Sequence, residues 1–493
     1  MHRRLNTEYW MYTMKPKKTY LLLVTTILLM ATLACRAIFP ETSPTESAQP
    51  QQQVQTENQE AGIKKSSEGD EEEYFEMPTF SGEEQTLDSE HFRIHYTLSG
   101  NDAVSSLEYV NTVAEIMEHV WQVEVEQMGW TPPPPDGGFG GDDRYDVYLL
   151  NIFEDGTAGY SDGGFPETVV GDNPRTPFVE TRSHYSYLAL DNDYIELYEY
   201  GDGSVTTLEF MKSTAAHEFN HALQFAYDGE EPAEWLWEAT ATWVQSQVYP
   251  QIHDADEELV SVFKSPDTCQ LAYGGETRVE DENHWYGLWI FMQYISENYG
   301  PETVRSIWEH ARELDGYEPL EVALFDAGTT LDETFRGFSL ALLTRGFERG
   351  SEYPTLRLEG VAAPGETFTP NDGVGQMAAD YLQIQAEVPV TIRLETESLH
   401  GMLVGLRDGN TSLFPMDDNQ ASVDAGQFDH IYLIVINPSR AETEFDCQFT
   451  TYNVRVDLIS QSTSLPIPNT HPAPNFEPPQ VEELLDPEEY WDE

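Results

Sequence analysis

A chain of 493 residues is long enough to bury more than one hydrophobic core, so we expect several domains. It carries 88 acidic residues against 25 basic ones, a formal net charge of -63. A surface this acidic repels nucleic acids and anionic lipid headgroups, which excludes both as expected partners. The charge otherwise favours solubility, and some of the carboxylates could bind calcium.

Residues 1–35 have the layout of an export signal. Basic residues as far as Lys18 precede an apolar run over residues 20–31. The run ends shortly before Cys35, in a pattern that resembles a bacterial lipoprotein signal, whose cysteine carries the lipid. Ordinary signal cleavage and a retained membrane anchor are the alternatives, although the run is short for crossing a bilayer. We expect an extracytoplasmic protein, secreted or tethered to the cell surface, that touches the membrane only through this segment.

Residues 36–85 are rich in Pro, Gln, Glu, Ser and Thr and contain almost no aliphatic side chains. Such a composition buries too little apolar surface to offset the entropy of folding. The segment is predicted to be a disordered acidic linker. An inhibitory propeptide is the alternative.

Strands and helices alternate in the first part of residues 86–350. The expected elements are strands at 91–96, 145–152 and 187–193, and an amphipathic helix from 104 to about 128. The loop over 131–143 is rich in Pro, Gly and Asp. It could seat calcium, although it lacks the alternating ligands of a calcium-hand loop.

A metal-ligand pattern follows at His217 and His221, which lie four residues apart in a helical run and therefore on one helix face. Glu218 is turned about 100° from His217, near enough to hold a metal-polarised water without ligating the metal. Catalytic zinc usually takes a third protein ligand. Glu238 is the best candidate, because a turn at 228–232 lets a second helix fold back. Thr242, one turn later, is placed to support a ligand.

The HExxH motif at 217–221, followed by the E-A-x-A-x-W segment from Glu238 to Trp243, resembles the gluzincins, the thermolysin-like clan of zinc metallopeptidases. The resemblance implies a zincin-like α+β domain, with a mixed sheet in the upper lobe, a helical lower lobe and a cleft between them. It implies that His217, His221 and Glu238 bind Zn²⁺ and that Glu218 is the general base. It also implies that the strand at 187–193 lies at a sheet edge and pairs with peptide; an interior strand is the alternative.

Further helices are expected at 284–295, at 302–314, and from a capping box at Thr330 through Leu343. Zincins commonly place a Tyr or His opposite the metal, where it donates a hydrogen bond to the oxyanion. Tyr286, with His284 beside it, is the candidate for this catalytic role. An aromatic residue that only packs in the helix is the alternative.

Residues 351–459 are predicted to form an all-β, sandwich-like accessory domain. Short alternating segments are separated by Gly, Pro, Asn and Asp turns, and no His, Cys or Ser cluster has catalytic spacing; the segments lie at 381–385, 390–394, 402–406 and 431–436. Residues 460–493 are Pro-rich and acidic and are predicted to be a disordered tail. Cys269 and Cys447 could form a disulfide between the two domains or remain two buried thiols.

Together these patterns predict an exported zinc metalloendopeptidase, in which a metal-activated water and Glu218 hydrolyse peptide bonds of a peptide or protein substrate. The main alternative is a catalytically inactive zincin-fold lipoprotein that serves in binding or adhesion. A zinc hydrolase of a non-peptide amide is a weaker one. Neither the peptide specificity nor the oligomeric state has a signal in the sequence.

Overall fold

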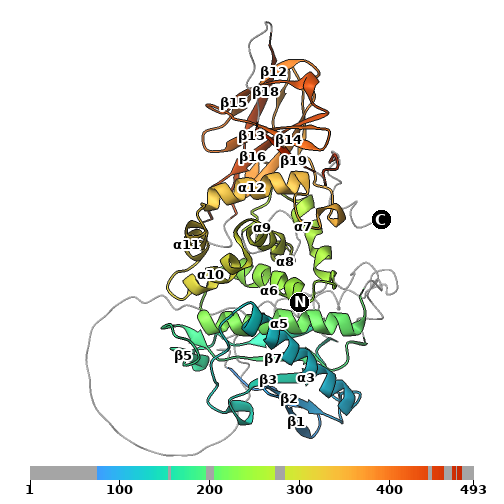
Figure 1. Cartoon of the computed structure of the whole chain (residues 1–493), viewed down its shortest axis with the longest axis vertical. Coiled ribbons are helices and arrows are strands. Elements are labelled where there is room, and N and C mark those ends of the chain that lie inside the picture. The colour runs from blue at the N-terminus through green and yellow to red at the C-terminus, as the bar shows by residue number, and fades with distance from the viewer. Residues whose placement is uncertain are drawn as a thin grey trace, which may run out of the picture.

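The computed structural model of the protein describes residues 75–153, 157–195, 205–271, 284–441, 447–459, 469–473 and 475–479. The expected export signal with Cys35, and the expected linker as far as residue 74, lie outside these ranges. Within them no helix is long and apolar enough to cross a bilayer. Figure 1 shows three layers along the long axis: a mixed sheet at one end, helices in the middle and a β-rich region at the other end.

The first layer is a five-stranded mixed sheet. Its order is β1 (Glu84–Asp88), β2 (Phe92–Thr97), β3 (Tyr145–Leu150), β7 (Tyr187–Asp191) and β4 (Gly159–Asp162). The three central strands are parallel, and β1 and β4 pair antiparallel at the two edges. The strands expected at 91–96, 145–152 and 187–193 are confirmed. A two-stranded ribbon of β5 (Val169–Gly171) and β6 (Ser183–His184) follows β4 in sequence.

One expectation about the edges of this sheet is wrong. The strand at 187–191 is interior, because β4 pairs with its outer side. β4 reads Gly-Tyr-Ser-Asp, which is too short and too polar to show a strand pattern. β1 begins at Glu84, next to the expected end of the linker at about residue 85, and pairs along its whole length with β2. Its sequence, Glu-Gln-Thr-Leu-Asp, holds one apolar residue, so the neighbouring strand rather than apolar alternation fixes it.

Two helices cover one face of the sheet. α3 (Leu107–Trp121) buries its apolar residues at three-and-four spacing and continues as a π-helical turn over Gln122–Gln127, so the amphipathic helix expected here is confirmed. α5 (Thr207–Tyr227) starts at a capping box of Thr206 and Glu209 and packs on β4 and β7. α6 (Glu234–Val248) folds back along α5 after the expected turn.

The remaining helices form the middle layer. They are α7 (Leu259–Lys264), α8 (His284–Gly287), α9 (Trp289–Tyr299), α10 (Pro301–Ala311), α11 (Glu318–Asp326) and α12 (Leu331–Thr344). The helix expected at 284–295 is divided at Leu288 into α8 and α9. Gly287 lies so close to the Glu258 carbonyl that a Cβ there would stand 2.4 Å from its oxygen. The helices expected from 302 and from 330 are confirmed, the latter capped by Thr330.

The β-rich region contains two main sheets that enclose one apolar core. The six-stranded sheet has the order β19 (Asn469–Pro472), β14 (Asn410–Phe414), β13 (His400–Arg407), β16 (His430–Asn437), β11 (Ala378–Ile384) and β8 (Gly360–Ala362). The four-stranded sheet has the order β15 (Gln420–Asp424), β12 (Pro389–Glu395), β18 (Asn453–Leu458) and β9 (Thr367–Phe368). A small ribbon joins β10 (Val374–Gly375) and β17 (Phe449–Thr450).

This region is tied to the helices more firmly than an accessory module requires. The outer side chains of β11, β13 and β16 belong to the same apolar core as α9 and α12, and the Tyr381 hydroxyl donates to the Ser339 carbonyl at 2.9 Å. Cys269 and Cys447 form a disulfide, which decides between the two alternatives for these cysteines. The tail is not wholly unstructured as expected, because β19 pairs with β14 through its backbone.

Candidate metal centre

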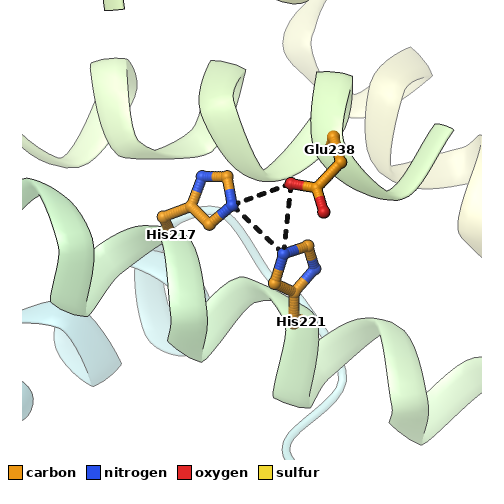
Figure 2. Close-up of side chains that lie close together, drawn as sticks. All are labelled: His217, His221 and Glu238. Carbon is orange, nitrogen blue, oxygen red and sulfur yellow. Dashed lines mark hydrogen bonds and ion pairs between the residues drawn. The ribbon is translucent and has the colours of Figure 1, made fainter. Parts of the chain in front are cut away.

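Three side chains that the sequence singles out converge between α5 and α6. His217 Nε2 lies 3.1 Å from Glu238 Oε2 and 3.1 Å from His221 Nε2, and His221 Nε2 lies 3.5 Å from Glu238 Oε2 (Figure 2). With zinc–ligand bonds of about 2.0–2.2 Å in a tetrahedron, ligand atoms stand roughly 3.3 Å apart. The triad of His217, His221 and Glu238 therefore has the spacing of a zinc site.

The orientation of His217 is fixed from behind by an amide. His217 Nδ1 lies 2.9 Å from Gln245 Oε1, while Gln245 Nε2 donates to Ser213 Oγ at 2.9 Å and to Asp254 Oδ1 at 3.4 Å. Because a carboxylate only accepts, the Gln245 amide is oriented with its oxygen toward the histidine. His217 therefore donates from Nδ1 and directs the lone pair of Nε2 into the triad.

His221 is oriented in the same way by Gln224, whose Oε1 lies 2.7 Å from Nδ1. Gln224 Nε2 donates to Asn220 Oδ1 at 3.1 Å and to the Trp237 carbonyl at 3.0 Å. Asn220 in turn donates to Glu124, which is fully buried on the π-helical turn, and burial raises the pKa of the Glu124 carboxyl well above its usual range. A chain of buried polar groups therefore holds the second histidine.

The three side chains of the triad shift one another's pKa values. Burial lowers the pKa of His217. Burial also opposes the charge on His221, but the Glu238 carboxylate outweighs it and raises the pKa of His221. Burial raises the pKa of Glu238, and the two histidines outweigh it and hold that pKa well below its usual range. The raised pKa of His221 favours a proton there when no metal is bound, and a metal that binds here must displace that proton.

Glu218 lies between the triad and the edge strand. It is 2% exposed, and its backbone carbonyl accepts from Ser161 Oγ of β4 at 2.6 Å. A Cβ on Gly159 of the same strand would stand 3.0 Å from Glu218 Cγ, so this glycine leaves room for the glutamate side chain. Its charge acts on both histidines. The expected base therefore sits under β4 and beside the ligands.

Tyr286 is also brought to the triad. Its ring centroid lies 5.8 Å from that of His217, and the side chain is 4% exposed. His284 is buried at the start of the same short helix, α8. Tyr286 is thus adjacent to a ligand, as the expected role requires, while that role itself stays a proposal.

The supporting role expected of Thr242 is wrong. Its side chain is fully buried, and Thr242 Oγ1 has no hydrogen-bond partner. Gln245 and Gln224 orient the two histidines instead, and sequence reasoning missed both. Gln224 follows His221 by three residues and Gln245 follows Glu238 by seven, which are spacings that keep a side chain on the face of the preceding ligand. That periodicity is the signal that could have found them.

In the Pro- and Gly-rich loop considered for calcium, Asp142 is paired with Arg144 at 2.6 Å and with Arg93 at 2.8 Å. No three acidic side chains of that loop converge, within the described ranges. Elsewhere in the described residues, three other groups of acidic or histidine side chains do converge. They are Asp228 with Glu231 and Asp315, Asp267 with Glu359 and Asp372, and His253 with Asp256 and Glu352.

Comparison with known proteins finds a match to one family, whose function is unknown. The family described as "Family of unknown function (DUF6055)" matches residues 204–331, from just before α5 to the first residue of α12. This stretch contains the whole triad, Glu218 and Tyr286 and is less than half of the chain. No curated protein matches the sequence significantly. The chain is therefore similar to a family of unknown function over the helices that carry the candidate metal centre.

Proposed function

We propose that this protein is a zinc-dependent metalloendopeptidase of the gluzincin type, with a zincin-like domain. The observation that carries the proposal is the triad: three ligand atoms 3.1–3.5 Å apart, with both histidines oriented so that Nε2 faces inward. Two nitrogens and one carboxylate oxygen suit zinc better than calcium or magnesium. Three protein ligands leave a position for water, as in catalytic rather than structural zinc sites.

The residues around the triad supply acid–base chemistry. Zinc held by His217, His221 and Glu238 would lower the pKa of a bound water toward neutrality and would polarise a substrate carbonyl group. Glu218 accepts the proton of the attacking water and returns it to the leaving amine. Tyr286, beside His217, donates a hydrogen bond to the oxygen that becomes negative as the carbonyl is attacked. Gln245 and Gln224 hold the imidazole rings of the two histidines in the same orientation during the reaction.

The corrected sheet topology offers a place for the substrate. Asp191 N donates to the Ala158 carbonyl at 3.1 Å, and hydrogen-bonded pairs alternate along an antiparallel ladder. By this alternation the N–H and C=O groups of Gly159 and Ser161 point away from β7, toward the free edge of the described sheet. A peptide that adds there as a sixth strand lies over Glu218. We infer that β4, and not β7, receives the substrate.

Two features support a site of action outside the cytoplasm. The disulfide between Cys269 and Cys447 favours an oxidising compartment. The export signal expected from the sequence, with its lipoprotein-like cysteine, agrees with a secreted or surface-tethered enzyme. Its substrates are then peptides or proteins outside the cell.

The test combines metal analysis with digestion of a broad peptide library, with and without a chelator. We expect about one zinc per chain and cleavage that the chelator stops. Glu218→Gln should keep the zinc and lose about 10²–10⁴-fold in cleavage rate. Glu230→Gln, a change of a partly exposed side chain in the turn after α5, is the matched control. Full activity of the Glu218 variant would refute the mechanism, and zinc binding without cleavage would favour the inactive binding lipoprotein instead.

A further inference from the structure

A second convergence of ligand-type side chains lies on the turn that joins α5 to α6. Asp228 ends α5, Glu231 lies in the turn, and Asp315 follows α10; one carboxylate oxygen of each lies within 4.8 Å of the others. We propose that these three residues, called here the acidic group, bind Ca²⁺ and that the ion holds the α5–α6 turn in place. The inference is independent of the proposed peptidase activity.

The charge balance of the acidic group calls for a divalent cation. Three carboxylates face one guanidinium, because Arg182 pairs with Asp228 Oδ2 at 2.7 Å and with Asp315 Oδ1 at 2.7 Å. Asp228 is completely buried and Glu231 is 5% exposed. Buried charge without a counter-charge is costly. The three ionised carboxylates and Arg182 leave a charge of -2, which one Ca²⁺ offsets.

The second observation is an oxygen that is oriented but unused. Glu231 Oε1 accepts from Ala233 N at 2.8 Å and from Gly316 N at 2.9 Å, which fixes the carboxylate between two segments. Glu231 Oε2 is buried and has no hydrogen-bond partner. An acceptor in this state normally has a partner of some kind, and a cation beside Asp228 and Asp315 would be that partner.

The donor chemistry selects calcium among common cations. All three ligands are hard carboxylate oxygens, which zinc does not prefer over nitrogen and sulfur. Asp315 is about half exposed, so solvent can supply the further oxygens that calcium needs for six to eight ligands. Magnesium demands a stricter octahedron and gives up its waters reluctantly. The alternative occupant is a proton, because burial raises the pKa of Asp228 to about 7 and that of Glu231 to about 8.

The position of the acidic group gives the ion a structural role. The turn connects the helix of His217 and His221 to the helix of Glu238. The Glu231 carbonyl accepts from Trp237 Nε1 at 3.1 Å, and Trp237 directly precedes Glu238. An ion that fixes Glu231 therefore also fixes the first turn of α6.

The experiment measures thermal unfolding of the full chain, loaded with one equivalent of zinc, in calcium-free buffer and in millimolar CaCl₂ or MgCl₂. We expect calcium to raise the melting temperature by about 5 °C or more and magnesium to raise it by less. Glu231→Gln keeps an oxygen for the N–H groups of Ala233 and Gly316 but removes the charge. It should lose the calcium shift and, without calcium, melt no lower than the unchanged protein. Glu230→Gln should keep the full shift.

A second variant keeps the test decisive if Glu231→Gln folds poorly. Asp315→Asn changes an exposed side chain and should weaken calcium binding about tenfold or more in calorimetric titration, with zinc content unchanged. An equal calcium shift in both variants and in the unchanged protein would mean that calcium binds elsewhere on the acidic surface, and the proposal would fall. The absence of any calcium shift between pH 7 and 8.5 would overturn it in favour of protonated carboxyl groups.

Discussion

The triad lies on α5 and α6, whereas the acidic group lies on the turn that joins them and on the loop after α10, and the two sites surround their side chains differently. In the triad, neutral amides of Gln245 and Gln224 stand behind the histidines and direct one nitrogen of each inward. In the acidic group, charge accumulates against one arginine and an oxygen of Glu231 is left without a hydrogen bond. Neutral histidines, each held by an amide oxygen that accepts its Nδ1–H, suit a metal that must keep an open position for chemistry. Crowded carboxylates suit an ion that only stabilises a turn.

The largest expected effect comes from breaking the triad alone. His221→Ala removes one of three ligands, so zinc content should fall from about one per chain to near zero and peptide cleavage should stop. The calcium shift in melting temperature should remain, because the acidic group keeps all its residues. Metal analysis and thermal unfolding measure the two separately. His310→Ala, a change on the surface of α10, is the control, and loss of both metals in His221→Ala would contradict the independence of the two sites.

A proton offers a different way to disturb the turn of the acidic group. His184 packs against this turn, where a Cβ on Gly229 would stand 2.4 Å from its ring, and Glu230 lies 3.9 Å from His184 Nε2. Burial lowers the pKa of His184 to about 4. Between pH 4 and 6.5 the folded protein thus binds fewer protons at His184 than the unfolded chain does. The contribution of the neutral His184 to folding stability is therefore fully present above pH 6.5 and is lost as the pH falls toward 4.

Between pH 7 and 4, the free energy of unfolding of the unchanged protein should fall by at most about 3 kcal/mol more than that of the His184→Asn variant. Asparagine can keep the hydrogen bond that His184 Nδ1 makes to Thr168 Oγ1 at 2.8 Å. Chemical unfolding at a series of pH values measures the difference, and His310→Asn is the exposed-histidine control. Identical pH profiles for the His184 variant and the unchanged protein would show that the histidine does not titrate in this range.

The amides behind the triad are tested by a change that removes only their hydrogen bonds. Gln245→Leu keeps the approximate volume and leaves His217 Nδ1 without an acceptor, so zinc affinity should fall about 10–100-fold. The zinc affinity of each variant is measured by competition with a chelator that changes colour when it binds zinc. Gln247→Leu, on the same helix but directed toward Ser246 and Gln293, should change the affinity little. Equal affinities for both variants would mean that the amide does not orient the ligand.

Sequence periodicity alone predicts the structure correctly where the residues of one short segment determine it. The four-residue spacing of His217 and His221, and the turn that returns Glu238 to them, are fixed by helix geometry, so the sequence alone predicts that the triad converges. The same holds for α3, for α12 and for the long strands of the β-rich region. In each of these helices the apolar pattern and the capping residues agree.

Features that depend on a distant partner have no local signal. β4 and β1 are polar segments that become strands because a neighbour pairs with them, so apolar patterning finds neither, and the strand that the resemblance places at the edge is in fact interior. The acidic group joins residues from separate turns, and among so many acidic residues their spacing means nothing on its own. Thr242 is one turn from Glu238 and Gln245 is two, so a search limited to one turn finds the threonine and not the amide.

The smallest predicted effect tests the corrected position of the sheet edge. In Ser161→Pro the edge strand loses one outward N–H, which β7 does not use, and loses the hydroxyl that donates to the Glu218 carbonyl. Ser161→Ala loses only the hydroxyl and is therefore the matched control. If peptide adds to β4, the proline variant should show kcat/KM roughly tenfold below that of the alanine variant, the worth of about one backbone hydrogen bond, with zinc content equal in both. Equal kcat/KM values would place the peptide elsewhere, and a loss of zinc in the proline variant alone would show that the strand shapes the triad rather than binding substrate.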